Sequence, residues 1–130
     1  MQKARTILII EDNEVVQAQT RAFIQTRYRT LGREVQVIQA PSAKQGLEFL
    51  RMHGLEFDII LLDGCLDGQE PDGLQMIPDI RALYSGPILA MSKSFELREM
   101  MLKAGATHQC EKSYAAGTAV SILEQQEIAA

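Results

Sequence analysis

The sequence has little of what several protein classes require. Its 130 residues include two cysteines, Cys65 and Cys110, which are too few for a disulfide framework and do not form a zinc-ligand pattern. The formal net charge is −4 and there is no basic run, so we expect no direct binding of nucleic acid. No apolar run approaches the length of a membrane span, and the first residues lack the apolar region of a signal peptide. We therefore expect a cytoplasmic protein that does not contact a membrane.

What is present is the composition of an ordinary globular domain. Hydrophobic residues make up 46% of the chain and charged residues 23%, which argues against an intrinsically disordered protein. A chain of this length can bury one hydrophobic core. The sequence shows no internal repeat, low-complexity tract or linker. We therefore expect a single domain over residues 1–130.

Short apolar runs alternate along the chain with segments of helical spacing. The expected strands are 6–10, 35–39, 57–62, 87–91 and 107–110. The expected helices are 14–30, one between Ser42 and Gly54, one through Met76, Ile77, Ile80 and Leu83, then 95–104 and 114–126. In the first helix, the apolar residues near helical spacing are Val15, Ala18, Ala22 and Phe23. This alternation predicts an α/β fold, a three-layer sandwich whose five-stranded parallel sheet has the flavodoxin-like order 2-1-3-4-5.

Polar side chains follow the predicted strands where each strand ends. Glu11 and Asp12 follow the first strand, Asp63 follows the third, Ser92 the fourth and Lys112 the fifth. The carboxyl ends of neighbouring parallel strands meet at one edge of a sheet, where open α/β proteins usually build their sites. Three carboxylates there repel each other unless a cation lies among them, and an all-oxygen cluster suits Mg²⁺. A hydroxyl and an ammonium group at the same edge suit a phosphoryl group.

Each of these residues alone has a more common structural role. A Glu-Asp pair after a strand is often an acidic helix N-terminus, Ser92 alone is most often a helix cap, and Lys112 alone is usually a surface charge. Their order at successive strand ends is what favours a metal and phosphoryl site.

The ordered set of Glu11-Asp12, Asp63, Ser92 and Lys112 resembles the response regulator receiver domains of two-component signalling, of the single-domain, chemotaxis-regulator-like kind. The resemblance covers essentially the whole chain as one receiver with no output domain. It implies a phosphoprotein that takes a phosphoryl group from a histidine kinase or a histidine phosphotransfer protein. It also implies signalling to a further, unidentified protein, with no enzymatic turnover beyond the receiver's own phosphorylation and dephosphorylation.

The resemblance assigns a role to each residue of the set. Asp63 becomes the phosphoryl acceptor through an aspartyl phosphate, Ser92 holds a phosphoryl oxygen, and Lys112 pairs with the aspartyl phosphate. The ligands of a bound Mg²⁺ or Mn²⁺ become Glu11, Asp12, Asp63 and the backbone carbonyl of Cys65.

The loop after Asp63 departs from the family pattern. The Asp72-Gly73 pair comes two residues later than is usual, Leu66 stands where methionine is expected, and Asp67 stands where proline is expected. Asp67, Glu70 and Asp72 add negative charge beside the predicted site, and we interpret them as solvated loop carboxylates.

Three further positions differ from the family pattern. Lys93 follows Ser92, where a small residue is usual, and we expect it to point to solvent. Gln109 stands where many receivers carry a switching tyrosine or phenylalanine, which puts the usual coupling to Ser92 in question. Ser113 replaces the proline that usually follows the lysine, so we expect a trans peptide bond after Lys112.

Three other functions are compatible with parts of the pattern. A pseudo-receiver that keeps the fold as a phosphorylation-independent scaffold is favoured by Gln109, Lys93 and the long loop. An aspartate-dependent phosphatase normally has a second acid two residues after its nucleophile, but this chain has Cys65 there. A flavin carrier of the same topology needs a phosphate-binding loop after the first strand, and the acidic residues 11–14 would repel a phosphate.

Overall fold

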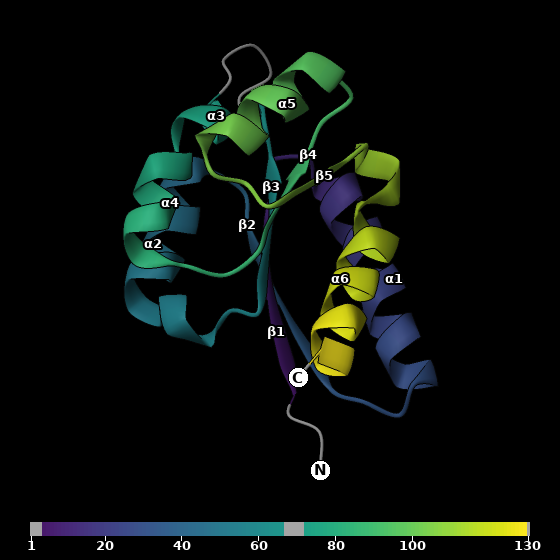
Figure 1. Ribbon diagram of the computed structural model, residues 1–130. Helices are drawn as coiled ribbons and strands as arrows, with labels where there is room; N and C mark the ends of the chain where they lie inside the picture. Colours follow the sequence, from purple (N-terminus) through teal and green to yellow (C-terminus); the bar gives the residue numbers. More distant parts are fainter. Residues whose placement is uncertain (1–3, 67–71, 130) are drawn as a thin grey trace.

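Five parallel strands form one sheet in the order β2-β1-β3-β4-β5, and helices cover both of its faces (Figure 1). The computed structural model describes residues 4–66 and 72–129. The strands are β1 (Arg5–Ile10), β2 (Val35–Ala40), β3 (Ile59–Asp63), β4 (Ile88–Met91) and β5 (His108–Cys110). The helices are α1 (Glu14–Thr30), α2 (Ala43–His53), α3 (Asp72–Gln75), α4 (Ile77–Leu83), α5 (Phe95–Ala104) and α6 (Ala115–Ala129). The predicted three-layer architecture and strand order are confirmed.

Two hydrophobic cores lie on opposite faces of the sheet. Strand residues alternate between the faces, so that Ile7 and Ile9 of β1 face α1 and α6, while Leu8 and Ile10 face α2, α4 and α5. Figure 1 shows α1 and α6 together on one side of the sheet, and α2 and α4 on the other. Each isoleucine or leucine buried in this way contributes about 1.5–3 kcal/mol of hydrophobic stabilisation. The central strands are buried on both faces, which explains their continuous apolar sequences.

Local signals in the sequence set several helix boundaries. The side chain of Asn13 accepts hydrogen bonds from the backbone N–H groups of Val15 and Val16 and caps α1. After this helix, Gly32 has a φ of +68°, a conformation that glycine adopts without a steric penalty. Ser94 caps α5 by accepting from Leu97 N–H at 3.1 Å. Ser92 does not cap this helix: its hydroxyl oxygen accepts from Ser94 N–H.

Several predicted bounds differ from the structure. The helix expected through Met76, Ile77, Ile80 and Leu83 is α4, with Pro78 in its first turn, where the missing N–H costs little. A short additional helix, α3, precedes it in the segment expected to be a loop. The third strand begins at Ile59, two residues later than expected, since a short 3₁₀ turn at Gly54–Glu56 precedes it.

The apolar residues expected to mark the buried face of α1 do not all lie there. The buried residues of this helix are Gln17, Thr20, Ile24 and Tyr28, whereas Val15 and Phe23 are more than half exposed. The structure places a strip of apolar side chains on the outer surface of α1.

None of the described helices is long and apolar enough to span a membrane. The peptide bond between Lys112 and Ser113 is trans, as expected, and it lies in a 3₁₀ turn at Lys112–Tyr114 that leads into α6.

Candidate functional site

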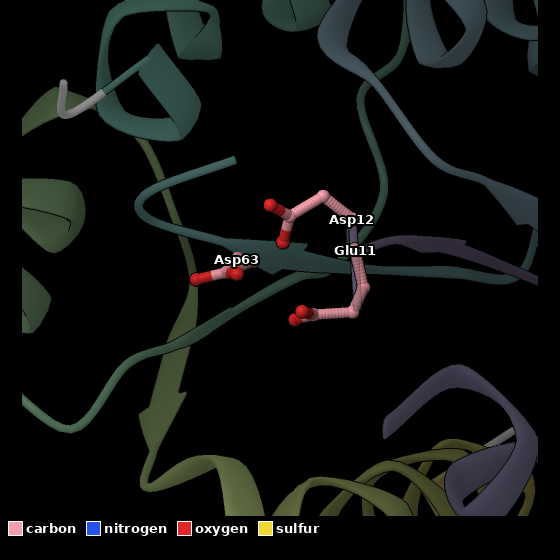
Figure 2. A group of neighbouring side chains, drawn as sticks. All are labelled: Glu11, Asp12 and Asp63. Carbon is pink, nitrogen blue, oxygen red and sulfur yellow. The ribbon is translucent and has the colours of Figure 1, made fainter. Parts of the chain in front are cut away.

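Three carboxylates meet at the carboxyl edge of the sheet. Glu11 and Asp12 follow β1 directly, and Asp63 is the last residue of the adjacent β3. The parallel register pairs Ile10 with Leu62, so the next residue of each strand carries a carboxylate at the same height. Figure 2 shows the three side chains directed toward one another, and an oxygen from each lies within 4.8 Å of the others. The predicted acidic cluster is therefore present.

The carboxylates differ in exposure. Glu11 and Asp63 are buried, with exposed fractions of 0% and 1%, while Asp12 is exposed. The pKa of Glu11 is raised to about 7: burial is the largest cause, the hydrogen bond and charge of the neighbouring Asp63 add to it, and Asn13 N–H and Lys112 act against them. A buried acid with this pKa indicates strong repulsion and desolvation at the centre of the site.

Lys112 lies against the two buried acids. Its Nζ is 2.7 Å from Asp63 Oδ2 and 3.4 Å from Glu11 Oε2. Burial alone would lower the pKa of Lys112, but the hydrogen bond to Asp63 and the negative charges of both acids outweigh it, so the pKa is raised. The predicted lysine thus remains charged and carries its ammonium to the predicted acceptor.

The acidic cluster has the properties of a divalent-cation site. Glu11 Oε1 accepts a hydrogen bond from Asn13 N–H, but Glu11 Oε2 is buried and has no hydrogen-bond partner among residues 4–66 and 72–129. A cluster of carboxylates offers only oxygen ligands, which suit Mg²⁺ and similar hard cations. A buried carboxylate oxygen that, within this part of the chain, makes no hydrogen bond and has only the Lys112 ammonium, at 3.4 Å, as a charged partner lies here beside two further carboxylates, an arrangement that a bound cation would stabilise.

Cys65 adjoins Asp63. Its backbone N–H donates to Asp63 Oδ1 at 3.2 Å, and its side chain is half-buried. Burial raises the pKa of the Cys65 thiol, and the charge of Asp63 raises it further. The thiol is therefore protonated at neutral pH and is a poor nucleophile.

The residues at the end of the long loop, Asp72 and Gly73, contact the residues that follow Asp63. Leu66 N–H donates to Asp72 Oδ1 at 2.6 Å, and Gly73 N–H donates to Gly64 O at 3.0 Å. A Cβ atom on Gly73 would lie 1.8 Å from the carbonyl oxygen of Asp63, so only glycine fits there. Although the loop is two residues longer than is usual, the Asp72-Gly73 pair is in contact with the end of β3. Leu66 is fully buried. Asp67 and Glu70 lie outside the described residues.

Ser92 lies at the end of β4, one residue after the partner of Asp63 in the sheet. The register pairs Asp63 with Met91, and Ser92 is buried. Its N–H donates to Cys110 O at 3.4 Å. Its hydroxyl oxygen accepts from Ser94 N–H, which leaves the hydroxyl hydrogen able to donate. Lys93 is exposed, as expected.

Gln109 takes part in a polar network that the sequence reasoning did not find. Gln109 Oε1 accepts from Arg98 Nε at 2.7 Å, and Arg98 Nη1 donates to the carbonyl of Ser92 at 2.7 Å. Gln109 Nε2 donates to Glu99 Oε1 at 3.1 Å. The sequence signal that could have revealed this network is the position of Arg98. It lies three residues before Met101, and therefore on the same face of the predicted helix 95–104, the face that packs against the sheet.

A groove runs from the site between α1 and the start of α6. It has a volume of about 380 Å³, and the residues that line it include Val16, Phe23, Lys93, Lys112 and Ala116. Phe23 is 53% exposed although it is a large aromatic side chain. We call this surface the α1–α6 groove.

Comparisons with known proteins agree with this geometry. The family model of the response regulator receiver domain matches residues 7–124. A comparison with curated protein sequences gives no significant match.

Several solved structures share the fold at low sequence identity. Chemotaxis protein CheY4 of Vibrio cholerae is 20% identical, with a TM-score of 0.72 over 95% of this chain and 98% of that one. The BeF3-activated N-terminal receiver domain of RstA from Klebsiella pneumoniae is 21% identical, with a TM-score of 0.73 over 93% and 97% of the two chains. A Burkholderia pseudomallei response regulator, solved with a phosphorylated aspartic acid, calcium ion and citrate, is 24% identical, with a TM-score of 0.67 over 95% of this chain and 72% of that one. Because the family model spans most of the sequence and the structure has the fold of these proteins, the chain belongs to the response regulator receiver domain family of two-component signalling.

Proposed function

We propose that this receiver accepts a phosphoryl group on Asp63 from a phosphohistidine, in a two-component or phosphorelay pathway, and signals by changed contacts with another protein. The observation that carries the proposal is the 2.7 Å hydrogen bond between Lys112 Nζ and Asp63 Oδ2, at a sheet edge that holds two further carboxylates. The phosphoryl donor is a histidine kinase or a histidine phosphotransfer protein. The receiver catalyses only its own phosphorylation and dephosphorylation.

The Asp63 carboxylate acts as the nucleophile. One of its oxygens attacks the phosphorus atom while the bond from phosphorus to the imidazole nitrogen breaks, and that bonding pair stays on the imidazole. The imidazole leaves as neutral histidine because its other ring nitrogen carries a proton or because it takes one from solvent, and the second product is an aspartyl phosphate. Hydrolysis reverses the modification: water attacks the same phosphorus atom, loses a proton to solvent, and releases inorganic phosphate and the carboxylate.

The chain's own residues supply positioning and charge to this transfer. Phosphoryl transfer depends mainly on alignment and on neutralisation of the phosphoryl charge. The Lys112 ammonium lies against Asp63 and offers one positive charge. The Ser92 hydroxyl can donate to a phosphoryl oxygen, because its own oxygen already accepts from Ser94 N–H.

A divalent cation, Mg²⁺ or Mn²⁺, completes the proposed site. Its protein ligands are Glu11, Asp12, Asp63 and the backbone carbonyl of Cys65. The buried Glu11 Oε2, which makes no hydrogen bond within the described residues, and the close approach of the three carboxylates support this assignment. When bound, the cation supplies positive charge that offsets both the carboxylates and the phosphoryl oxygens.

The α1–α6 groove is the surface where we place the donor protein. The donor must bring its histidine within bonding distance of Asp63, and Lys112 borders both the acceptor and this groove. Phe23 and Val16 give the groove an apolar side close to the two lysines, which suits a helix that carries both an apolar face and a phosphorylated side chain.

Intact mass spectrometry tests the proposal. Wild type and Asp63→Asn are incubated with acetyl phosphate, with Mg²⁺ and with a chelator. We expect the wild type to gain one phosphoryl group only when Mg²⁺ is present, and Asp63→Asn to gain none. Circular dichroism confirms that the isosteric variant is folded.

The result also separates this function from a phosphorylation-independent scaffold. A folded wild type that gains no mass with Mg²⁺ and acetyl phosphate would favour the scaffold, as would equal labelling of wild type and Asp63→Asn. In that case the exposed Lys93, which lines the groove beside Lys112, is the first position to change.

A further inference from the structure

The guanidinium of Arg98 is buried next to the proposed phosphoryl site. The residue is only 8% exposed, on the face of α5 that covers β4 and β5. Its two short hydrogen bonds, both 2.7 Å, go to neutral oxygens: the carbonyl of Ser92 and Oε1 of Gln109. The Phe95 ring, 5.6 Å from the guanidinium carbon, contributes a cation–π contact. Burial of a charged group destabilises the fold unless specific hydrogen bonds offset the lost hydration. The bonds to Ser92 and Gln109 are therefore the interactions through which Arg98 acts on its surroundings.

Arg98 fixes a segment that already has little freedom. The backbone N–H of Ser92 donates to Cys110 O, its hydroxyl accepts from Ser94 N–H, and its carbonyl accepts from Arg98. A χ1 rotation that moved the hydroxyl toward a group on Asp63 would break its hydrogen bond to Ser94 N–H, whereas a shift of the whole peptide can keep that bond. Any such shift changes the contact between the Ser92 carbonyl and Arg98.

The network continues from Arg98 to the surface. Gln109 accepts from Arg98 with one end of its amide and donates to Glu99 with the other, at 3.1 Å. Since the amide is planar, a displacement of Arg98 rotates or moves both ends together. Glu99 is half-buried on α5, so the far end of the network is accessible to a partner. Hydrogen-bonded chains of this kind transmit polarisation and position from one end to the other.

We propose that Arg98 is a positioning residue that holds Ser92 ready for the phosphoryl group on Asp63 and couples it, through Gln109, to Glu99 at the surface of α5. The inference rests on the proposed function, because it requires a phosphoryl group on Asp63. Linkage makes the coupling reciprocal: a protein that fixes Glu99 changes the stability of the aspartyl phosphate.

The first test follows the side-chain amide of Gln109 by NMR in protein labelled with ¹⁵N-glutamine. Mg²⁺ and acetyl phosphate are added, and intact mass reports the fraction phosphorylated. We expect the Gln109 signal to shift on phosphorylation of wild type, while the Gln39 signal, from an amide that donates to Gln17 O at the other edge of the sheet, stays in place. In Ser92→Ala, compared at the same fraction phosphorylated, we expect the Gln109 shift to collapse.

The second test measures labelling rates in a double-mutant cycle. Arg98→Met slows phosphorylation on the order of tenfold in wild type, but by less than about twofold in a Ser92→Ala background, since residues of one network do not act additively. A purely structural effect would slow both backgrounds by the same factor. Arg98→Gln, which keeps a donor for the Ser92 carbonyl, replaces Arg98→Met if that variant does not fold.

The outcomes distinguish this inference from the proposed function. A wild type that is phosphorylated by mass but shows no Gln109 shift overturns the role of Arg98 alone, as does an undiminished shift in Ser92→Ala or equal slowing in both backgrounds. A wild type that gains no phosphoryl group overturns the proposed function and this inference with it.

Discussion

Lys112 balances the charge of the acids at the sheet edge. Its ammonium is within 4 Å of both Asp63 and Glu11, which are buried and cannot be screened by water. A carboxylate left without a partner in such a place keeps its desolvation cost, and the pKa of Glu11 is already raised to about 7 by burial and, after it, by the neighbouring Asp63. A bound divalent cation would also offset the repulsion between the carboxylates. We therefore expect a bound cation to compensate in part for the loss of Lys112.

Replacement of the lysine tests this charge balance. We expect Lys112→Met to lower the free energy of unfolding by about 2 kcal/mol at neutral pH without divalent cations, because buried carboxylates lose their partner. Saturating Mg²⁺ should restore part of the loss by binding to the folded state. Urea denaturation with and without Mg²⁺ measures both effects. The matched control is Lys93→Met, which removes an exposed lysine of the same groove and should change the stability by less than about 0.5 kcal/mol.

The acidic and basic residues of the site could be predicted from the sequence, but the residues around them could not. Asp63 ends the apolar strand β3 and Lys112 comes soon after the short strand β5, and strand ends alone bring them to one edge. Arg98 was not predicted, since its burial depends on a carbonyl and an amide supplied by β4 and β5. Phe23 was assigned to packing, because helical spacing does not show which face a polar residue such as Gln17 will take.

Arg81 joins three segments at the end of the sheet opposite the acidic cluster. Its guanidinium donates to the carbonyl oxygens of Gly105, Tyr84 and Gly86, at distances between 2.7 and 3.2 Å. These carbonyls terminate α5 and α4 or lie in the turn before β4, so each would otherwise lack a helical or sheet partner. The side chain therefore positions the turn that starts β4, the strand that carries Ser92 at its other end.

Loss of this side chain should destabilise the fold. We expect Arg81→Met to lower the free energy of unfolding by about 2–3 kcal/mol, because several partly buried carbonyls lose a charged donor while the apolar stem is kept. Urea denaturation measures the change. Arg51→Met, at an exposed position in the last turn of α2, provides the control and should stay near wild type. Equal stability of the two variants would contradict the role of Arg81.

Ion pairs attach the end of α6 to β1 and β2. Arg33 and Arg5 both hydrogen-bond to Glu127, and Arg5 also pairs with Asp58 at 3.3 Å. The hydrogen bond from Arg33, followed by the one from Arg5, holds the pKa of Glu127 below its usual value. A carboxyl whose pKa is lowered by folding stabilises the protein above the unfolded pKa and loses that contribution as the pH falls through the folded pKa.

The stability of Glu127→Gln should therefore depend on pH in a defined direction. We expect the variant to be less stable than wild type at pH 7 and the difference to shrink as the pH is lowered below the ordinary value of 4.5. Thermal or urea unfolding across this range measures the difference. Glu48→Gln, an exposed change on α2, should show no such trend. A difference that is constant or grows at low pH would show that the ion pairs do not stabilise the fold.

The bounds of whole elements were predictable where a cap and a stop frame an apolar pattern. Helices α1 and α5 have the predicted bounds, because Asn13 and Ser94 start them and glycines follow them. The position of Pro78 in the first turn of α4 agrees with the prediction. The short helix α3 was not predicted, because its four residues, Asp72–Gln75, are too few to show a helical apolar pattern.

At the scale of the whole molecule, the sheet edge and the α1–α6 groove form one continuous surface. Helices α1 and α6 lie side by side on the same face of the sheet (Figure 1), and Lys112 stands where the groove meets the acidic cluster. Phe23 remains half exposed there. A large aromatic side chain at the centre of a surface groove is a common anchor for a partner protein.

Phe23→Ala separates donor docking from the chemistry at Asp63. We expect transfer from a phosphorylated histidine phosphotransfer protein that labels the wild type to fall on the order of tenfold, the size of effect seen for an aromatic anchor. Labelling by acetyl phosphate, which needs no docking surface, should remain near wild type. Leu55→Ala, at a fully exposed leucine after α2, should affect neither rate. An unchanged rate of transfer from the phosphotransfer protein to Phe23→Ala would show that the donor does not dock in this groove.

The most direct measurement is the chemical identification of the phosphorylated residue. An aspartyl phosphate is an acyl phosphate, so borohydride reduces it to homoserine, which peptide mass spectrometry can locate in the digested protein. After incubation with Mg²⁺ and a phosphoryl donor, we predict homoserine at position 63 and aspartate retained at positions 12 and 72. Homoserine at another position, or none in protein that has gained a phosphoryl group, would contradict the assignment of Asp63 as the acceptor.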